Sequence, residues 1–327
     1  MVEDRLHLGK TQINLVFRSV CTTLTYGRRY SRSRKLKIFL VFSSLNRTFV
    51  GMKQVRPKKN LGQHFLTDLS IAKRIADTVD ACPDLPVLEV GPGMGVLTQY
   101  LMEKPRPLKV VEIDSESVAY LKGTLFKEER SEEGGERSNQ IIEGDFLRMD
   151  LRTLFDGGQF VLTGNYPYDI SSQIFFKMID NRDLIPCCTG MIQREVALRI
   201  ASQPNNKAYG ILSVLIQAWY DVEYLFTVDE TVFNPPPKVK SAVIRMTRNK
   251  VERLGCDEKL FKLVVKTVFG QRRKMLRVSL RQMFPADSSL FTLHSSFLTK
   301  RPEQLSVGDF VELTNMVEAY LCTNTNI

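Results

Sequence analysis

The sequence lacks three features that would each assign it to a class of protein. Its longest apolar run, residues 36–42, is far too short to cross a bilayer and is interrupted by Lys37. Its six cysteines show no Cys-x-x-Cys spacing, and with only three histidines they form no recognisable metal site. We therefore expect no metal and no membrane contact, and we expect the cysteines to be reduced thiols of a cytoplasmic protein.

Acidic residues are scarce only at the N-terminus. Residues 1–51 hold ten Lys or Arg against two acids, Glu3 and Asp4, whereas the rest of the chain holds 36 basic and 34 acidic side chains. The net charge of +10 therefore says little about the folded body, and a nucleic-acid site must rest on local basic clusters. Residues 1–51 resemble a transit peptide in composition. We favour the alternative of an untranslated stretch before a start at Met52, and we expect a loosely ordered segment without chemistry.

The pattern after residue 60 is that of an α/β protein. Short apolar segments at residues 87–90, 108–113, 140–143 and 160–163 alternate with helical spacing, for example at residues 96–103 and 116–126. This alternation predicts a parallel, doubly wound sheet. Residues 222–228 and 241–246 are expected to add an antiparallel edge pair, and residues 127–139 a polar surface loop.

A change of pattern near residue 251 predicts a second unit. From there the apolar spacing is wholly helical, with helices expected over residues 259–269, 272–283 and 307–320. The sequence therefore predicts a basic extension over residues 1–51, a main domain over residues 52–250 and a small helical domain over residues 251–327.

Glycines and acids at the expected strand ends indicate a nucleoside cofactor. The turn Gly-Pro-Gly-Met-Gly at residues 91–95 lies where a strand becomes a helix, so the backbone can approach a ligand closely. Glu112 ends the next strand, where a carboxylate can accept both hydroxyls of a ribose. The spacing departs from the dinucleotide pattern G-x-G-x-x-G, and Pro92 removes a backbone donor, which favours S-adenosylmethionine over NAD. Asp145 ends the third strand and can hold an adenine amine or cap a helix.

A rigid strand end at residues 161–168, Val-Leu-Thr-Gly-Asn-Tyr-Pro-Tyr, is suited to a nucleobase amine. Pro167 fixes its own backbone and forbids helix at the residue before it. The side-chain oxygen of Asn165 and the carbonyl beside Pro167 can each accept a hydrogen bond from the amine. Tyr168 offers a π-face for the base. The alternative is an ordinary strand-to-turn exit.

Five motifs occur together and in order. They are Lys-Lys-Asn-Leu-Gly-Gln-His-Phe-Leu at residues 58–66, Glu-Val-Gly-Pro-Gly at 89–93, Asn-Tyr-Pro-Tyr at 165–168, Phe-Asn-Pro-Pro-Pro-Lys-Val at 233–239 and Gln-Arg-Arg-Lys at 271–274. With them, the chain from about residue 53 onward resembles the ribosomal RNA adenine dimethyltransferase family, in particular its bacterial small-subunit branch. The resemblance implies a Rossmann-like class I S-adenosylmethionine-dependent methyltransferase with a small C-terminal α-helical domain.

The resemblance also implies a role for each site residue. His64 and Leu66 would line the methionine end of the cofactor site, and Asn165 would contact cofactor and target amine together. Many relatives have Asn at position 64 and Leu at position 166, and we expect both departures to alter packing more than chemistry. The cofactor-binding set is then His64, Leu66, Gly91, Gly93, Glu112, which holds the ribose, Asp145, which holds the adenine, and Asn165.

The expected mechanism follows from the weak nucleophilicity of an adenine amine. The base would leave its stack and lie with Tyr168 on one face and Phe233 on the other, while acceptors at Asn165 and Pro167 aim the lone pair at the methyl group. No general base is needed, since the proton can leave to water. Arg272, Arg273, Lys274 and Arg277, with Arg281, form a basic helical patch for RNA phosphates or a plain solvated face.

The preferred function is dimethylation of two adjacent adenines in the 3′-terminal hairpin loop of small-subunit rRNA. The partner would be the small ribosomal subunit during its assembly, met by a monomeric enzyme in the cytoplasm. Two alternatives stay open: an antibiotic-resistance-type dimethyltransferase acting on large-subunit rRNA, and a non-catalytic RNA-binding assembly factor.

Overall fold

The computed structural model describes residues 57–58, 63–126, 140–284 and 297–324. The predicted extension over residues 1–51 and the predicted polar loop over residues 127–139 lie outside the described residues. Within the described ranges no helix is long and apolar enough to cross a membrane. The same ranges contain no group of three or more His, Cys, Asp or Glu placed to hold a metal ion.

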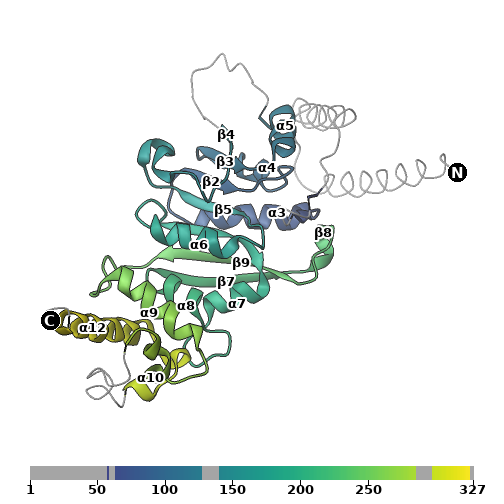
Figure 1. The fold of residues 1–327 in the computed structure, drawn as a ribbon. Coiled ribbons are helices and arrows are strands. Elements are labelled where there is room, and N and C mark those ends of the chain that lie inside the picture. The colour runs from purple at the N-terminus through teal and green to yellow at the C-terminus, as the bar shows by residue number, and fades with distance from the viewer. Residues whose placement is uncertain (1–56, 59–62, 127–139, 285–296, 325–327) are drawn as a thin grey trace, which may run out of the picture. The chain divides into compact units, whose positions relative to one another are not determined.

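A seven-stranded sheet forms the centre of the described part of the chain (Figure 1). Its five parallel strands pair in the order β4, β3, β2, β5 and β6, and the antiparallel strands β9 and β7 extend it beyond β6. The α/β fold with an antiparallel edge pair is therefore confirmed. The strands are β2 (Val87–Val90), β3 (Leu108–Glu112), β4 (Gln140–Glu143), β5 (Val161–Asn165), β6 (Cys187–Gln193), β7 (Tyr220–Val228) and β9 (Ser241–Arg248).

Buried side chains alternate between the two faces of this sheet. Neighbouring residues of a strand point to opposite faces, so each strand supplies both apolar layers. One layer contains Val87, Val161, Met191 and Val243, and the other contains Leu88, Leu162, Ile192 and Ile244. Helices cover both layers: α3 (Leu69–Ala76) and α4 (Thr98–Leu101) belong to the first, and α6 (Ser171–Asp180), α7 (Arg194–Ala201) and α8 (Ile211–Gln217) to the second.

Aspartate side chains fix where several helices begin. Asp68 Oδ1 accepts hydrogen bonds from the backbone N–H groups of Ser70 (2.8 Å) and Ile71 (3.2 Å) at the start of α3. Asp114 caps α5 (Ser115–Thr124) and also accepts a 2.5 Å hydrogen bond from Lys58. Each such cap contributes about 1 kcal/mol to helix stability. Through its hydrogen bond with Lys58, Asp114 also holds residue 58 at the start of α5.

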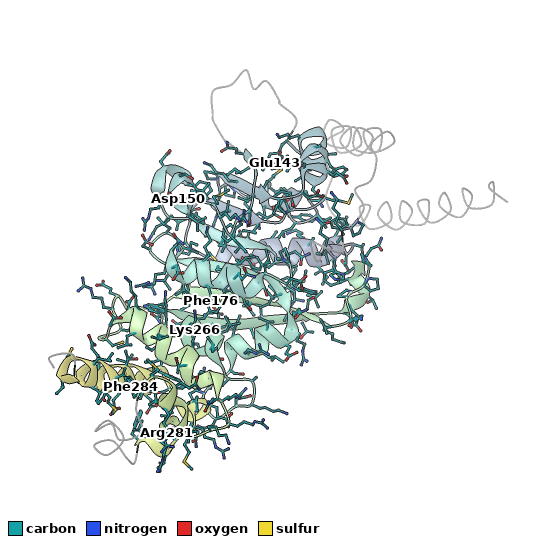
Figure 2. All side chains as sticks on the ribbon, viewed as in Figure 1. Glu143, Asp150, Phe176, Lys266, Arg281 and Phe284 are labelled. Carbon is teal, nitrogen blue, oxygen red and sulfur yellow. A yellow bond between two sulfur atoms is a disulfide. The ribbon has the colours of Figure 1, made fainter. Side chains whose placement is uncertain are left out.

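The C-terminal helices pack against the same apolar layer as α6 and α8. Phe261 meets Trp219 edge-on at 6.1 Å, and Lys266 lies 5.6 Å from the ring centre of Phe176 on α6 (Figure 2). The division of the chain at residue 250 stays a prediction. The helices here are α9 (Glu258–Gly270), α10 (Leu276–Ser279) and α12 (Val307–Asn324), with 3₁₀ turns η6 (Leu280–Gln282), η7 (Phe297–Thr299) and η8 (Pro302–Gln304).

The helix expected over residues 272–283 is wrong in its first turn. After α9 the chain forms hydrogen-bonded turns, with Arg272 N–H donating to Phe269 C=O (3.2 Å) and Lys274 N–H to Gln271 C=O (2.8 Å), and α10 begins only at Leu276. Basic residues 272–274 therefore lie on a turn. Further 3₁₀ turns in the described chain are η2 (Asp77–Ala81), η3 (Leu151–Thr153), η4 (Phe155–Gly157) and η5 (Glu230–Val232).

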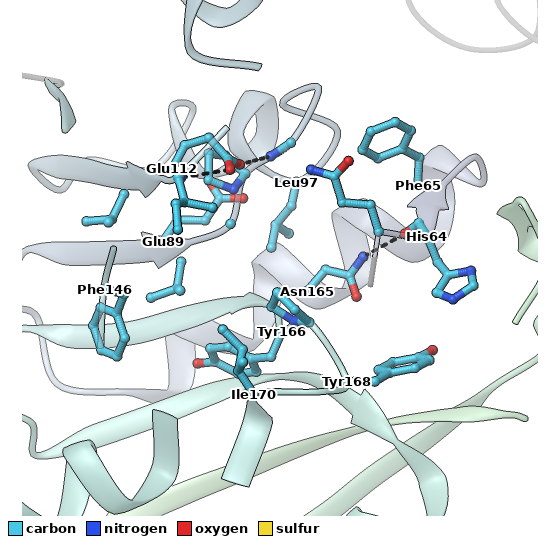
Figure 3. A pocket seen from close by; sticks show the side chains of 18 of the residues that line it. His64, Phe65, Glu89, Leu97, Glu112, Phe146, Asn165, Tyr166, Tyr168 and Ile170 are labelled. Carbon is cyan, nitrogen blue, oxygen red and sulfur yellow. Dashed lines mark hydrogen bonds between the residues drawn. The ribbon is translucent and has the colours of Figure 1, made fainter. Parts of the chain in front are cut away.

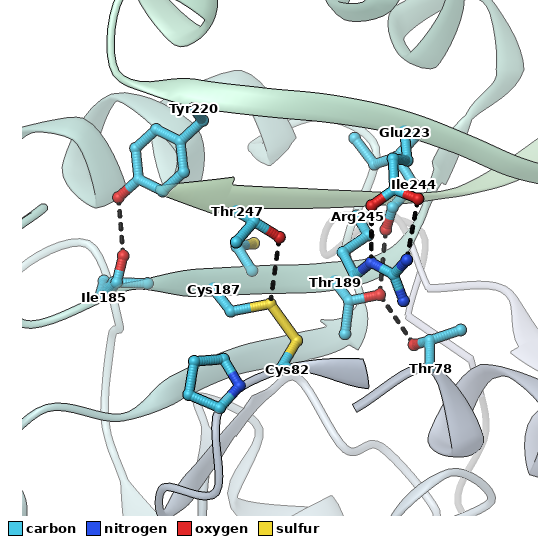
Figure 4. Close-up of a disulfide and its surroundings, with 12 residues drawn as sticks. Thr78, Cys82, Ile185, Cys187, Thr189, Tyr220, Glu223, Ile244, Arg245 and Thr247 are labelled. Carbon is cyan, nitrogen blue, oxygen red and sulfur yellow. Dashed lines mark hydrogen bonds and ion pairs between the residues drawn. A yellow bond between two sulfur atoms is a disulfide. The ribbon is translucent and has the colours of Figure 1, made fainter. Parts of the chain in front are cut away.

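The expectation of reduced thiols is wrong for two cysteines. A disulfide joins Cys82, which follows η2, to Cys187 at the start of β6 (Figure 4). The fold brings their Cα atoms within 5.8 Å, although 105 positions separate them in the sequence, so no local spacing could reveal the pair. Cys188, Cys256 and Cys322 carry free thiols, and Cys21 lies outside the described residues.

Candidate active site

A cleft of about 250 Å³ opens where the parallel strands end (Figure 3). In open α/β sheets, ligands bind outside the carboxyl ends of the strands. Six segments that are distant in the sequence line this cleft. They are residues 63–66, Ile75, residues 89–94 with 96–97, residues 111–113, residues 144–147 and residues 165–170.

Strand β1 (Phe65–Leu66) brings His64 to the cleft. It pairs with β8 (Phe233–Asn234), and Thr67 N–H extends the pairing through a 2.8 Å bond to Val232 C=O. His64 Nδ1 lies 2.8 Å from the carbonyl oxygen of Pro235. Since a carbonyl only accepts, Nδ1 carries the proton in this bond. The β1–β8 pair therefore fixes both the backbone and the ring of His64.

Glu112 is held by the glycine turn and by its own strand end. Gly93 has φ +55°, a conformation that favours glycine, and its N–H donates to Glu112 Oε2 at 3.0 Å. The N–H groups of Ile113 and Asp114 both donate to Oε1 at 2.9 Å. Burial raises the pKa of Glu112, and these three donors oppose the rise. A carboxylate has about four acceptor positions, so this one keeps capacity for a ligand hydroxyl.

Asp145 follows β4 and caps the turn behind it. Its Oδ1 accepts a 2.9 Å hydrogen bond from Leu147 N–H, while Arg148 Nε lies 3.4 Å from Oδ2. The side chain is 32% exposed, and Asp145 lines the cleft together with Phe146 and Leu147. The capping role is thus present, and Oδ2 leaves an acceptor at the cleft.

Asn165 and Tyr168 lie at the end of the cleft next to His64. The side-chain amide of Asn165 donates through Nδ2 to His64 C=O at 3.4 Å, which makes Oδ1 the acceptor end. The rings of His64 and Tyr168 are stacked, with centroids 5.7 Å apart. The Tyr168 hydroxyl is hydrogen-bonded to Ser241 Oγ on β9, so the ring is anchored at its far end. Burial raises the pKa of Tyr168, which therefore stays un-ionised.

Tyr166, directly after β5, is buried in the apolar layer that α6 covers. It is 1% exposed, meets Phe175 edge-on at 5.7 Å, and its hydroxyl donates to Thr189 C=O at 3.2 Å. A Cβ at Gly190 would lie 2.7 Å from this ring and 2.4 Å from a neighbouring carbonyl oxygen, so only glycine fits beneath it. Our expectation that Tyr at position 166 affects packing more than chemistry stays a prediction.

The structure does not bring two groups of predicted residues to the cleft. Phe233 is 4% exposed and packs in the apolar layer with Leu66 and Ile75, and it does not line the cleft. The basic residues of the turn before α10 lie apart from the cleft. Arg272 donates to Glu303 at 2.9 Å, whereas Arg273, Lys274, Arg277 and Arg281 are exposed, with Arg281 beside α10 in Figure 2.

Sequence reasoning missed Glu89, which lines the cleft from the middle of β2. The signal was present, because one carboxylate stands among apolar residues in the four-residue strand Val-Leu-Glu-Val. Glu89 is 1% exposed, and such residues are almost never fully buried unless paired. A charged residue at such a position is therefore a site candidate in its own right.

Comparison with known proteins identifies the family. A sequence profile described as ribosomal RNA adenine dimethylase matches residues 54–318. The chain belongs to this family. Two relatives named ribosomal RNA small subunit methyltransferase A come from Phocaeicola vulgatus and Porphyromonas gingivalis. The first is 66% identical over 84% of this chain and 95% of its own, and the second 59% identical over 82% of this chain and 100% of its own.

Solved structures confirm the fold of this adenine dimethylase. A dimethyladenosine transferase from Plasmodium falciparum superposes with a TM-score of 0.66 at 24% identity, covering 79% of this chain and 98% of its own. The 23S rRNA methyltransferase ErmE gives 0.56 at 24% identity, with 78% and 99% covered. The chain is thus an rRNA-modifying methyltransferase with a class I methyltransferase fold and C-terminal helices.

Proposed function

We propose that the protein transfers methyl groups from S-adenosylmethionine to the N6 amines of two adjacent adenines in the 3′-terminal hairpin loop of small-subunit rRNA. The observation that carries this proposal is the convergence of Asn165, Tyr168 and Glu112 on one cleft of an adenine dimethylase. The small-subunit target is supported by relatives at 59–66% identity that carry this name.

The cleft fits a cationic nucleoside cofactor. Glu89, Glu112 and Asp145 line it, and no Lys or Arg is among its described lining residues. Glu112 would hold the ribose, Asp145 the adenine, and Gly91 with Gly93 would let the backbone approach. His64 and Leu66 would line the methionine end, beside Asn165. When bound, S-adenosylmethionine supplies an electrophilic methyl group on a positively charged sulfur.

Asn165 would prepare the target amine for attack. Its Nδ2 is engaged by His64 C=O, so Oδ1 can accept a hydrogen from the amine. The carbonyl of Pro167 would accept the second hydrogen, since its present bond from Ile170 N–H is long at 3.3 Å and leaves a lone pair free. Two acceptors placed in this way pull the amine towards a tetrahedral shape and orient its lone pair. The proton then leaves to water.

Tyr168 would stack on the flipped adenine. The bond to Ser241 fixes the ring, and His64 already lies over one of its faces (Figure 3). A stacked base contributes roughly 1–3 kcal/mol to binding. Phe233 remains a proposed second stacking ring, and contact with the base would require it to leave the apolar layer in which it is buried.

The exposed cations of the turn before α10 and of α10 itself would bind RNA phosphates. Arg273, Lys274 and Arg277 are exposed on one short segment, as such contacts require. Arg272 is partly committed to Glu303 and to Asn206 C=O, so its contribution would be smaller. We propose that this surface docks a monomeric enzyme on the assembling small subunit in the cytoplasm.

The deciding experiment is tritiated methyl transfer from S-adenosylmethionine to small ribosomal subunits that lack the modification, with large subunits assayed in parallel. We expect label in small-subunit rRNA, at up to four methyl groups for two dimethylated adenines. Label only in the large subunit would establish the antibiotic-resistance-type alternative. Binding to small subunits without any label would instead support a non-catalytic assembly factor.

A further inference from the structure

Glu89 is a buried carboxyl group at the wall of the cleft that the proposed mechanism does not use. It lies between apolar neighbours on β2, is 1% exposed, and its Oε2 has no hydrogen-bond partner within the described structure. Thr98 Oγ1 faces it from α4 and is likewise buried; the two groups interact, but they form no hydrogen bond of ordinary geometry, so neither is satisfied within the described structure. Leaving a buried carboxyl oxygen unpaired is costly, and a ligand bound in the cleft can supply the missing interaction.

Among the described residues, no positive charge faces Glu89 to compensate its ionised form. The groups that face it are Thr98 from α4, Glu112 from β3 and Tyr166 from the end of β5. Burial, the largest cause, raises the pKa of Glu89 to about 8; Thr98 opposes this rise, and the nearby Glu112 adds to it. The carboxyl group therefore carries its proton at neutral pH while the cleft holds only water.

We propose that Glu89 releases its proton to solvent when the cationic methyl donor enters the cleft, and takes a proton back once the methyl group has left. The inference rests on the proposed function. S-adenosylmethionine carries a sulfonium, an ammonium and a carboxylate, so its net charge is +1, whereas the demethylated product carries no net charge. The donor thus stabilises the ionised carboxylate, and the product does not. Glu89 is accordingly a residue that makes the site prefer donor over product.

Proton counting by calorimetry tests this inference directly. Donor and product are each titrated into the protein at pH 7 in buffers of different ionisation enthalpy. Donor binding should release about one proton per site, and product binding close to none, because the folded pKa lies about one unit above the assay pH. The α-amino group is common to both ligands, so its contribution cancels in the difference. As the pH is increased towards 8, the affinity for the donor should rise by up to tenfold per pH unit, because less work is needed to remove the proton from Glu89.

Two variants locate the proton. Glu89→Gln keeps the shape of the neutral side chain and should abolish the difference in proton release, while affinity for the product is unchanged. Glu103→Gln removes an exposed carboxylate just after α4 and should behave as the unaltered protein does. Thermal melting of each variant confirms that it is folded, and the measurement on the unaltered protein needs no variant.

The possible outcomes separate this inference from the proposed function. Equal proton release for donor and product, or release that persists in Glu89→Gln, would overturn the role of Glu89 even if methyl transfer to rRNA is observed. Failure to bind the donor at all would instead contradict the proposed function.

Discussion

At the scale of single residues, Asn165 is positioned by another segment of the chain. Its Nδ2 donates to the backbone of His64, and that backbone is fixed in turn by the pairing of β1 with β8. An amide in water would turn freely between two orientations, whereas this contact favours the one with Oδ1 as acceptor. Under the proposed mechanism, the orientation of this acceptor would thus be set before the substrate arrives, and such preorganisation is what makes a hydrogen-bonding group effective in catalysis.

Replacement of Asn165 by Ala should therefore reduce methyl transfer by roughly 10²–10³-fold, the usual effect of removing one preorganised hydrogen-bonding group. Binding of small subunits should change little, because the exposed cations before α10 are untouched. Single-turnover methyl transfer and filter binding measure the two quantities. Asn315→Ala, at an exposed asparagine on α12, is the matched control. Unchanged turnover in Asn165→Ala would mean that the amine is activated by another group.

At the scale of elements, the shortest described strands position one end of the candidate active site. β1 and β8 have two residues each, yet they join residues 63–66 to the segment 232–235. Neither strand has enough residues for a period-two pattern, so the sequence could not predict their pairing. In the sequence, the motif at residues 233–239 stands out for its prolines and its resemblance to the family. The structure instead gives Phe233 a place in the apolar layer, beside Leu66.

Phe233→Ala should destabilise the protein by about 3 kcal/mol, since it leaves a cavity in a packed layer. The midpoint of urea unfolding measures this loss. Phe233→Leu retains most of the volume and should recover most of the stability. If Phe233→Leu is stable and still methylates rRNA normally, the ring acts only in packing. If it is stable but inactive, the ring is needed by the flipped base, as the sequence motif leads us to expect.

The turn before α10 carries one arginine that is paired with Glu303, Arg272, and two exposed cations, Arg273 and Lys274. Arg273→Ala combined with Lys274→Ala should weaken rRNA binding and lower the salt slope of log K by about 0.7–0.9 for each RNA phosphate that is no longer neutralised. Arg272→Ala should have a smaller effect on that slope and should lower thermal stability, because it leaves Glu303 without its partner. Salt titrations and melting curves distinguish the two. Lys250→Ala combined with Arg253→Ala, at two exposed cations outside the turn, is the charge-matched control for the double variant. If all variants show the same salt slope of log K as the unaltered protein, the RNA does not contact this turn.

At the scale of the whole molecule, the parts that the sequence predicts are those set by local pattern. The central strands are recognisable because their apolar runs are continuous, and Glu112 and Asn165 are recognisable because each one ends such a strand. Asp145 follows the short strand β4 by two residues. The remaining features depend on contacts between distant segments. The disulfide of Cys82 with Cys187 is one of these, and the burial of Glu89 among groups from three other elements is another.

The free energy of unfolding should depend on pH through the ionisation of Glu89. In the unfolded chain this carboxyl has its ordinary pKa of 4.5, while in the fold it keeps its proton to about pH 8. Between these values the folded state binds more protons, so the contribution is fully present below about pH 4.5 and is lost as the pH rises through about 8. Asp77 acts in the opposite sense. Hydrogen bonds from Lys104 and Lys73 lower its pKa, so its contribution is lost as the pH falls.

Urea unfolding at pH 5, 7 and 9 without ligand should therefore show the midpoint of the unaltered protein falling towards pH 9. In Glu89→Gln this decline should be absent or much reduced, because a glutamine side chain does not ionise. Asp77→Asn should retain the same decline, because the pKa of Asp77 is lowered from 3.8 and its contribution is lost only at pH values below this range. Saturating S-adenosylmethionine should restore stability at pH 9 more in the unaltered protein than in Glu89→Gln, since only the former offers it a carboxylate. Parallel midpoints for the unaltered protein and Glu89→Gln across this range would show that Glu89 does not titrate in the folded chain.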